Sequence, residues 1–293
     1  MAINFIVNPY SGRGRGEKAI KIIKEELNSE DIDFDIQTTT APKEAITLAK
    51  YAVNQGYNKI VAVGGDGTLN EVITGILQSD PPYPKLGLIA AGTGNNFARS
   101  IDLPLNLKKA CHKILSSNEM KMDIGQVNDR FFINSVGIGF NSIVANEANQ
   151  NFKHLHGTLV YMLAALKVMP EYKSVDLEIT LNTGELIKGK YLLLVIGNGK
   201  IYSKTLDLIP EFGINDGYLD LCLIAEMSKA ELMTKLPYFL TTQHQDLDQV
   251  LIKKIKEAKI KLKNTDQFHI DGEILHGNEL KINILPQILR VII

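Results

Sequence analysis

Short apolar runs alternate with segments of helical period over the first 125 residues. Residues 59–63 (KIVAV) form a continuous apolar run, whereas residues 17–27 place Ile20, Ile23 and Leu27 on one helical face. This alternation predicts a parallel sheet covered by helices on both sides. Strands are predicted at residues 3–7, 34–37, 59–63 and 86–90, and helices at residues 17–27, 43–54, 69–77 and 107–115.

The pattern changes after about residue 122, where apolar or alternating runs follow one another with few helices between them. Such runs, separated by turn residues, predict a mainly antiparallel β domain. We therefore expect an α/β domain over residues 1–125 and a β domain over residues 126–293. Strands are predicted at 131–136, 175–181, 191–196, 218–223, 260–262, 269–270 and 280–284, with helices near 158–168 and 229–241.

Composition narrows the class of protein. The 293 residues are 45% hydrophobic and 22% charged, which excludes disordered and fibrous classes. The chain has 32 Lys and Arg residues and 33 Asp and Glu residues, so its formal charge is −1. This charge predicts no overall attraction to nucleic acid or anionic membrane. The two cysteines, Cys111 and Cys222, are expected to be buried reduced thiols of a cytoplasmic protein. The longest apolar stretch, residues 159–169, is shorter than the ~20 residues that span a bilayer.

The strongest chemical signal follows the third predicted strand, where residues 64–68 (GGDGT) lead directly into a helix. Glycines allow the backbone to approach a ligand closely, and the N–H groups of a helix start face an anion. Asp66 stands where a Mg²⁺ ion bridging phosphates needs an oxygen ligand, directly or through water. The alternative is a tight turn in which Thr68 caps the helix.

Two further polar, glycine-rich loops follow the first and fourth strands, at residues 8–16 (NPYSGRGRG) and 91–99 (AGTGNNFAR). Ligands of open α/β sheets bind at the carboxyl ends of the strands, so we expect the three loops to form one site. The first loop is neither a Walker A sequence nor the dinucleotide fingerprint. Its glycine amides, with Arg13 and Arg15, nevertheless suit a polyphosphate.

Together with residues 271–273 (DGE), these loops resemble the diacylglycerol kinase catalytic-domain family, and most closely the soluble bacterial lipid kinases. The resemblance spans essentially the whole chain. It implies an α/β nucleotide domain like that of phosphofructokinase and NAD kinase, then a β-sandwich, with ATP and Mg²⁺ bound. It also implies that the nucleotide phosphates contact Asn8, Pro9, Ser11, Gly12, Thr39, Gly64, Gly65, Asp66, Gly67, Thr68, Asn70 and Thr93.

The late DGE triplet supplies two carboxylates. Phosphoryl transfer to an alcohol needs a base beside the hydroxyl and a metal that neutralises charge. We expect Glu273 to be the base, with Asp271 supporting it or the metal and Asp66 serving the metal as the third catalytic residue. Composition alone would favour a plain Asp-Gly β-turn.

Residues 209–220 are similar to the structural-metal loop of the family, which implies a second Mg²⁺ held by Asp216 and by the backbone oxygens of Gly213 and Tyr218. The alternative is an Asn-Asp-Gly turn without an ion. Asn96 departs from the family, which usually has Asp at this position, and metal affinity or rate is expected to change with it. The lysine-rich residues 253–263 are interpreted either as an edge strand protected by lysines or as a face that docks on anionic membrane.

The resulting hypothesis is an ATP- and Mg²⁺-dependent lipid kinase, with diacylglycerol as the preferred substrate and phosphatidic acid as its product. The protein is expected in the cytoplasm, meeting its lipid transiently at the inner face of the membrane, without nucleic acid as a partner. The sequence does not decide between a monomer and a homodimer. The alternatives are an NAD kinase-like or sugar kinase of the same superfamily, and a lipid-binding or regulatory module without catalytic activity.

Overall fold

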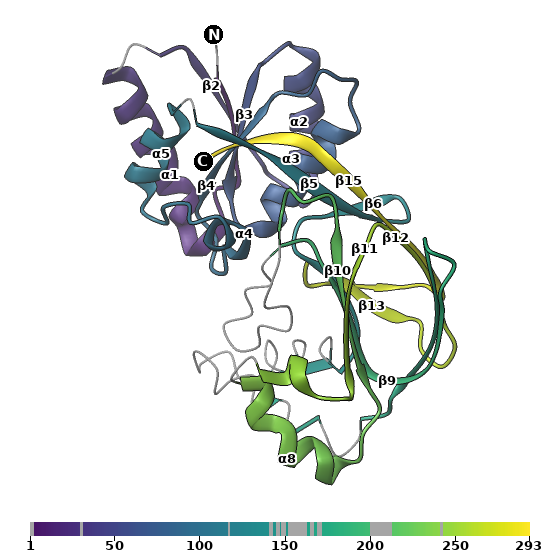
Figure 1. Ribbon diagram of the computed structural model, residues 1–293. Helices are drawn as coiled ribbons and strands as arrows, with labels where there is room; N and C mark the ends of the chain where they lie inside the picture. The colour runs from purple at the N-terminus through teal and green to yellow at the C-terminus, as the bar shows by residue number, and fades with distance from the viewer. Residues whose placement is uncertain are drawn as a thin grey trace. The chain divides into compact units, whose positions relative to one another are not determined.

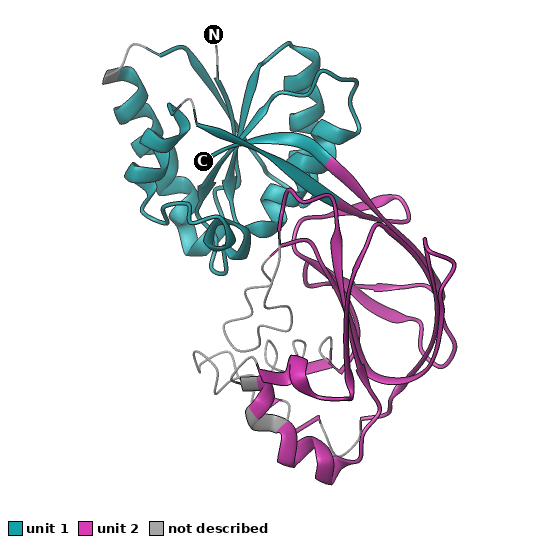
Figure 2. Cartoon of the chain, in the orientation of Figure 1, with its two compact units in different colours: residues 1–124, 287–293 teal, residues 125–286 magenta. Residues whose placement is uncertain are grey.

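The computed structural model divides the chain into two compact units (Figures 1 and 2). Unit 1 comprises residues 1–124 and 287–293, and unit 2 comprises residues 125–286. The structure describes residues 3–29, 32–116, 118–140, 143–144, 147, 151, 163–164, 167–168, 172–199, 213–240 and 243–293.

Unit 1 is built on a parallel sheet in the order β2-β1-β3-β4. Helices α1 and α5 cover one face of the sheet, and α2 and α3 cover the other (Figure 1). Double coverage explains why β3 is a nearly continuous apolar run and why side chains such as Phe5 of β1 and Val61 of β3 are fully buried. The strands are β1 (Ile3–Val7), β2 (Phe34–Thr38), β3 (Lys59–Gly64) and β4 (Lys85–Ala90); the helices are α1 (Ser11–Ser29), α2 (Glu44–Asn54), α3 (Asp66–Leu77), α4 (Asn96–Ser100) and α5 (Leu107–Ile114).

The register of the parallel strands brings their carboxyl ends to one edge. Val7 of β1 lies beside Val63 of β3, and Val63 lies beside Ile89 of β4. The loops that follow these strands therefore leave the sheet at the same level.

Two strands contribute to both units. β5 (Glu119–Val127) crosses the boundary at residue 124, and β15 (Glu279–Ile292) crosses it at residue 287. Within unit 1, β15 pairs in parallel with β4 through Val291 and Leu86. The Gln287 N–H donates to the buried carboxylate of Asp123 (2.6 Å), which joins β15 to β5. The predicted strand at residues 280–284 covers only the unit 2 part of β15.

Unit 2 consists of antiparallel strands in the order β14-β13-β7-β9-β8-β12-β15, and β9 also pairs with β10, which pairs with β11. Apolar side chains alternate with polar ones along β12 and β8 and pack into one core. The elements are β6 (Arg130–Phe132), β7 (Ser135–Gly139), β8 (Val175–Leu181), β9 (Leu186–Gly197), β10 (Leu219–Ala225), α8 (Lys229–Leu240), the 3-10 helix η1 (Gln243–Asp246), β11 (Val250–Ile255), β12 (Glu257–Leu262), β13 (Gln267–Ile270) and β14 (Glu273–His276).

The predicted fold class, a parallel α/β part followed by an antiparallel β-sandwich, is confirmed. The edge-strand interpretation of the lysine-rich tract is wrong for β12, because this strand has two neighbours, β8 and β15. Its lysines alternate with the buried Ala258, Ile260 and Leu262, which explains why the tract mixes charge with apolar residues. Most of the helix predicted near residues 158–168 lies outside the described residues. Among the described helices, none has the length and apolar character needed to cross a membrane.

Candidate active site

The three glycine-rich loops of unit 1 pack against one another at the carboxyl ends of β1, β3 and β4. A methyl group added to Gly12 would lie 2.0 Å from the Ala91 carbonyl oxygen, and one added to Gly92 would lie 2.4 Å from the Gly65 Cα. Both distances are far inside van der Waals contact, so glycine is needed for the first loop to approach the third and for the third to approach the second. The structure thus brings together the three loops that the sequence predicted as one site.

The first loop takes a tightly turned path into α1. Gly12, Arg13 and Gly14 all have positive φ, at +56°, +59° and +87°. The Asn8 side chain holds this path, because its Oδ1 accepts the Tyr10 N–H (3.1 Å) and its Nδ2 donates to Thr68 Oγ1 (3.3 Å). Asn8 therefore joins the first loop to the second.

Asp66 joins the second loop to the third. It opens α3, and its carboxylate accepts the N–H of Asn96 through Oδ2 (3.0 Å) and the N–H of Phe97 through Oδ1 (3.0 Å). The carboxylate thereby caps α4, in addition to the metal role predicted from the sequence. Each carboxylate oxygen has two lone pairs, so Asp66 still has the donor chemistry that fits Mg²⁺ or a water bound to it.

The start of α3 offers backbone N–H groups. The first intrahelical bond runs from the Leu69 N–H to the Gly65 carbonyl (3.0 Å). The backbone N–H groups that come before Leu69 in the first turn therefore have no acceptor within the helix. Gly65 is the cap residue, and Thr68 lies buried within the first turn, which contradicts the alternative of Thr68 as the N-cap. A methyl group on Gly67 would meet nothing within 4 Å, so this side of the turn is open to a ligand.

The other predicted phosphate-binding residues lie around these loops. Thr93 is exposed in the third loop, and Asn70 lies on α3, where its Oδ1 accepts the Thr74 hydroxyl (3.4 Å). Thr39 follows β2, is buried, and donates its N–H to the Val7 carbonyl at the end of β1 (2.9 Å). Pro9 and Ser11 flank the turn of the first loop.

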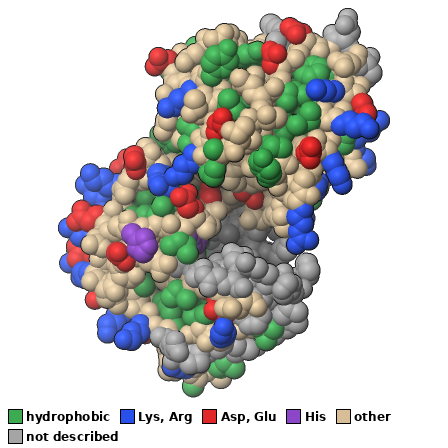
Figure 3. Space-filling model, turned by 180° about the vertical axis from the view of Figure 1, so that it is seen from behind, with side chains coloured by type: hydrophobic (Ala, Val, Ile, Leu, Met, Phe, Trp, Pro, Cys, Tyr) green, Lys and Arg blue, Asp and Glu red, His purple; other side chains and the backbone are tan. Residues whose placement is uncertain are grey.

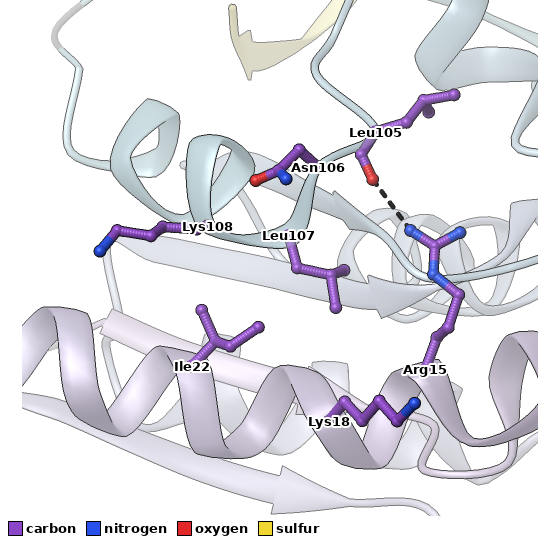
Figure 4. Close-up of a pocket in the computed structure, with 7 residues that line it drawn as sticks. All are labelled: Arg15, Lys18, Ile22, Leu105, Asn106, Leu107 and Lys108. Carbon is purple, nitrogen blue, oxygen red and sulfur yellow. Dashed lines mark hydrogen bonds between the residues drawn. The ribbon is translucent and has the colours of Figure 1, made fainter.

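Arg15 does not have the phosphate-facing position that its place in the first loop suggests. Its guanidinium donates to the Leu105 carbonyl (2.9 Å) and the Ala90 carbonyl (3.4 Å), and so supports the segment after β4 (Figure 4). It lines a hollow of about 410 Å³ between α1 and the start of α5, together with Lys18, Ile22, Leu105, Asn106, Leu107 and Lys108. Arg13, by contrast, is exposed.

In unit 2, the Asp-Gly turn connects β13 to β14 as a two-residue hairpin. Ile270 pairs with Glu273, and Asp271 and Gly272 have φ of +47° and +91°. The Asp271 carboxylate accepts three backbone N–H groups, from Ile133 at 2.9 Å, Asn134 at 2.8 Å and Ser135 at 2.9 Å. It therefore fixes the turn to the segment between β6 and β7.

Glu273 opens β14 and differs from Asp271 in its surroundings. Its side chain is 56% exposed, and its Oε1 lies 3.2 Å from Nη1 of Arg130. The carboxylate thus has Arg130 as a neighbour and is also accessible to solvent. The two predicted carboxylates therefore differ: Glu273 is exposed, whereas Asp271 is bonded to three backbone N–H groups.

Asp271→Asn is expected to destabilise unit 2. An amide at this position would present N–H donors to backbone N–H donors, and leaving buried donors unsatisfied costs about 1–3 kcal/mol. Urea denaturation would measure the loss. Glu273→Gln is the matched control, because an exposed substitution should change stability by no more than about 0.5 kcal/mol. An Asp271→Asn protein of normal stability and no activity would instead assign Asp271 a chemical role.

The Asp216 loop precedes β10. The Asp216 Oδ1 accepts the Tyr218 N–H (3.0 Å), Oδ2 pairs with the Lys254 ammonium, and a methyl on Gly213 would lie 2.9 Å from the Asp216 Cγ. The predicted segment 209–220 is described only from residue 213 onward. Backbone and carboxylate oxygens are the ligands that Mg²⁺ prefers, so the donor set fits this ion. In the described part of the chain, no three His, Cys, Asp or Glu side chains gather as a metal site.

Asp220 is a buried acid beside this loop that the sequence pattern did not single out. Its side chain has no hydrogen-bond partner for Oδ2 among the described residues, and the residue is 2% exposed. Burial raises the pKa of Asp220 to about 6; the Lys254 charge opposes the increase and the Asp216 charge adds to it. The loop therefore contains two carboxylates beside one ammonium.

Comparisons with known proteins match both units. Residues 2–127 match the diacylglycerol kinase catalytic domain, and residues 134–293 match the YegS C-terminal NAD kinase beta sandwich-like domain. A diacylglycerol kinase of Staphylococcus aureus (strain bovine RF122 / ET3-1) is 30% identical over 280 residues, which cover 96% of this chain and 88% of that protein. The diacylglycerol kinase of Staphylococcus carnosus (strain TM300) is 29% identical, with 96% and 90% covered.

Solved structures show the same fold. A crystal structure from Bacillus anthracis str. Sterne has a TM-score of 0.83 at 24% identity, covering 99% of this chain and 94% of that one. A crystal structure of a diacylglycerol kinase from the same strain has a TM-score of 0.77 at 20% identity, with 99% and 96% covered. With both family matches and this coverage of relatives, the chain belongs to the diacylglycerol kinase family and is a lipid kinase.

Proposed function

We propose that this enzyme transfers the γ-phosphoryl group of ATP, with Mg²⁺, to the free hydroxyl of diacylglycerol and so forms phosphatidic acid. The observation that carries the proposal is the contact of three glycine-rich loops at the strand ends of unit 1, with Asp66 bonded to the third loop. The curated relatives named diacylglycerol kinase support the choice of substrate.

In unit 1, the loops would bind the phosphates of ATP. The open turn at Gly67 and the N–H groups at the start of α3 suit a phosphate, because a helix N-terminus attracts negative charge. Asp66 would hold Mg²⁺, directly or through water. The metal would neutralise the charge of the transferred group.

In unit 2, Glu273 would accept the proton of the lipid hydroxyl as its oxygen attacks the phosphorus. Arg130 would orient the carboxylate through their 3.2 Å contact, and Asp271 would hold the hairpin that presents it. The Asp216 loop, with Gly213 and Tyr218, would hold a second, structural Mg²⁺. Its contribution would be to the stability of unit 2.

The lipid must be met at a membrane surface, and we infer a cytoplasmic protein that contacts the inner face transiently. The lysine-rich tract gives this contact little support. Several of its lysines have acidic partners, as in the pairs Lys253–Glu185, Lys261–Glu279 and Lys263–Glu178. On the face drawn in Figure 3, Lys and Arg side chains lie among Asp and Glu side chains. A mixed surface of this kind attracts anionic lipid weakly.

A phosphotransfer assay would test the proposed function. Labelled ATP and Mg²⁺ would be offered with diacylglycerol, phosphatidylglycerol, a sphingoid base and NAD in separate reactions. Labelled phosphatidic acid as the main product is the expected result. Labelled NADP would favour the NAD kinase alternative, and ATP binding without transfer to any acceptor would favour a non-catalytic lipid-binding module.

Asn96→Asp should change the Mg²⁺ dependence of the reaction. The Asn96 N–H already bonds to Asp66, so the substitution would place a second carboxylate beside the first. Two neighbouring carboxylates, at positions 66 and 96, attract a divalent cation more strongly than one carboxylate does. We expect half-maximal activity at a lower Mg²⁺ concentration, or a higher kcat, measured by titrating Mg²⁺ at saturating ATP. Identical titrations for both proteins would place residue 96 outside the metal network.

A further inference from the structure

The pairing of β10 with β11 places a lysine between the two acids of the Asp216 loop. In the antiparallel register Lys254 lies directly opposite Asp220. Cross-strand neighbours of this kind have side chains on the same face of the sheet. The Lys254 ammonium also contacts Oδ2 of Asp216, and Asp216 lies four residues before Asp220. One lysine therefore pairs with Asp216 and lies opposite Asp220.

Because Asp220 is buried, its carboxylate depends on a nearby cation. Its side chain shares the face of β10 with Cys222 and Ile224, which pack under α8 against Leu232 and Phe239. A carboxylate at 2% exposure with an unbonded oxygen is costly unless a cation lies nearby. Lys254 supplies that cation while remaining 47% exposed, so it can leave without unfolding the strand.

We propose that Lys254 is an internal cation that occupies the position of the Asp216 loop where Mg²⁺ binds, so that the metal must displace it. The inference rests on the proposed structural metal and adds to it a residue that sets the affinity. The ammonium and the ion compete for Oδ2 of Asp216, the same oxygen. The Tyr218 ring lies 6.0 Å from this ammonium while it is paired with Asp216. When the metal enters, the half-exposed lysine side chain moves to solvent.

Two consequences distinguish a competing lysine from a merely structural one. Without metal, removing the ammonium leaves Asp216 and Asp220 without their counter-ion, so unit 2 should become less stable. When Mg²⁺ is present, a variant without the ammonium has no competitor for the metal, so Mg²⁺ should bind it more tightly. The increase in stability on adding Mg²⁺ should therefore be larger for this variant than for the wild type. A structural ion pair unrelated to the metal would show only the first effect.

The experiment is a thermal melt of the full chain, without nucleotide, in chelator and across a Mg²⁺ titration. Lys254→Met is the test variant, and Lys256→Met is the matched control. Lys256 also lies near the Tyr218 ring (5.0 Å), whereas the ion pair with Asp216 is made by Lys254. We expect Lys254→Met to melt lower than wild type in chelator. Its Mg²⁺ midpoint should fall by about two- to fivefold, the modest effect typical of exposed ion pairs. Lys256→Met should keep the wild-type midpoint.

Different outcomes test the competition by Lys254 and the presence of a metal site at Asp216. Equal Mg²⁺ midpoints for Lys254→Met and wild type, with the Mg²⁺ response lost in Asp216→Asn, would keep the metal site and overturn the role of Lys254. No Mg²⁺ response in any variant would overturn the metal site and the competition together, while the lipid assay would still decide the kinase function. Where Lys254→Met does not fold, Lys254→Gln takes its place and must meet the same criterion.

Discussion

Glu273→Gln is expected to lower kcat by about 10²–10⁴-fold, the usual loss when a general base is removed. Glutamine keeps the shape of the side chain and can still accept a hydrogen bond from Arg130, but it cannot take up the proton of the lipid hydroxyl. The affinity for ATP should hardly change, because the proposed phosphate contacts come from the loops of unit 1. Steady-state kinetics and ATP binding measured on the same folded protein would check both.

The exposed position of Glu273 makes the result easy to interpret. At 56% exposure the substitution should leave the melting temperature unchanged, so lost turnover would report chemistry rather than misfolding. If residues 271–273 are only a turn, Gln should be tolerated with a few-fold loss at most. Wild-type turnover in this variant would remove Glu273 as the base and direct attention to Asp271.

Asp66→Ala should be the other severe substitution, with a loss in kcat of at least about 10²-fold, because it removes a charged ligand from the metal and phosphate cluster. The structure adds a second effect. The carboxylate also accepts two N–H bonds from α4, so Ala should lower stability as well. Kinetics at saturating Mg²⁺, together with a thermal melt, would measure the two losses separately.

Asp66→Asn is the matched variant for this position. The amide oxygen can still accept an N–H bond from the third loop, so the stability loss should be smaller than for Ala. The charge is gone in both variants, so activity should fall to a similar degree. An Asn variant with near-normal kcat at saturating Mg²⁺ would show that Asp66 acts as a helix cap and has no part in metal binding.

The location of the loops could be predicted from the sequence because it follows from local rules. A buried apolar strand such as residues 59–63 needs cover on both faces, and parallel strands in register must end at one edge. Glycines at residues 12, 65 and 92 then permitted the loops to touch. Periodicity and turn chemistry therefore sufficed to predict that the three loops of unit 1 lie together.

Partners distant in sequence could not be predicted. Arg130 reaches Glu273 across 143 positions, and Lys254 reaches Asp216 across 38, in each case because the tertiary fold brings them together. The three N–H groups that hold Asp271 belong to a segment with no distinctive side chains. Nothing in a single sequence states which backbone amides a carboxylate will meet.

β5 and the unit 1 end of β15 were missed for a different reason. β5 interrupts its apolar pattern with the buried Asp123, whose partner is the Gln287 N–H of β15. β15 itself bends where Gln287 adopts a φ of +49°, a conformation that strand patterns do not predict. A polar residue at a core-facing position of a strand indicates that a hydrogen-bond partner is needed, but only the structure identifies that partner.

The return of β15 to unit 1 has a consequence for how the chain matures on the ribosome. Leu289, Val291 and Ile292 are buried in unit 1, yet they are synthesised after all of unit 2. Until they emerge, β4 has no partner on one side and presents an open edge to other nascent chains. The N-terminal half therefore cannot reach its final state first, and a protein released a few residues early would expose that edge permanently.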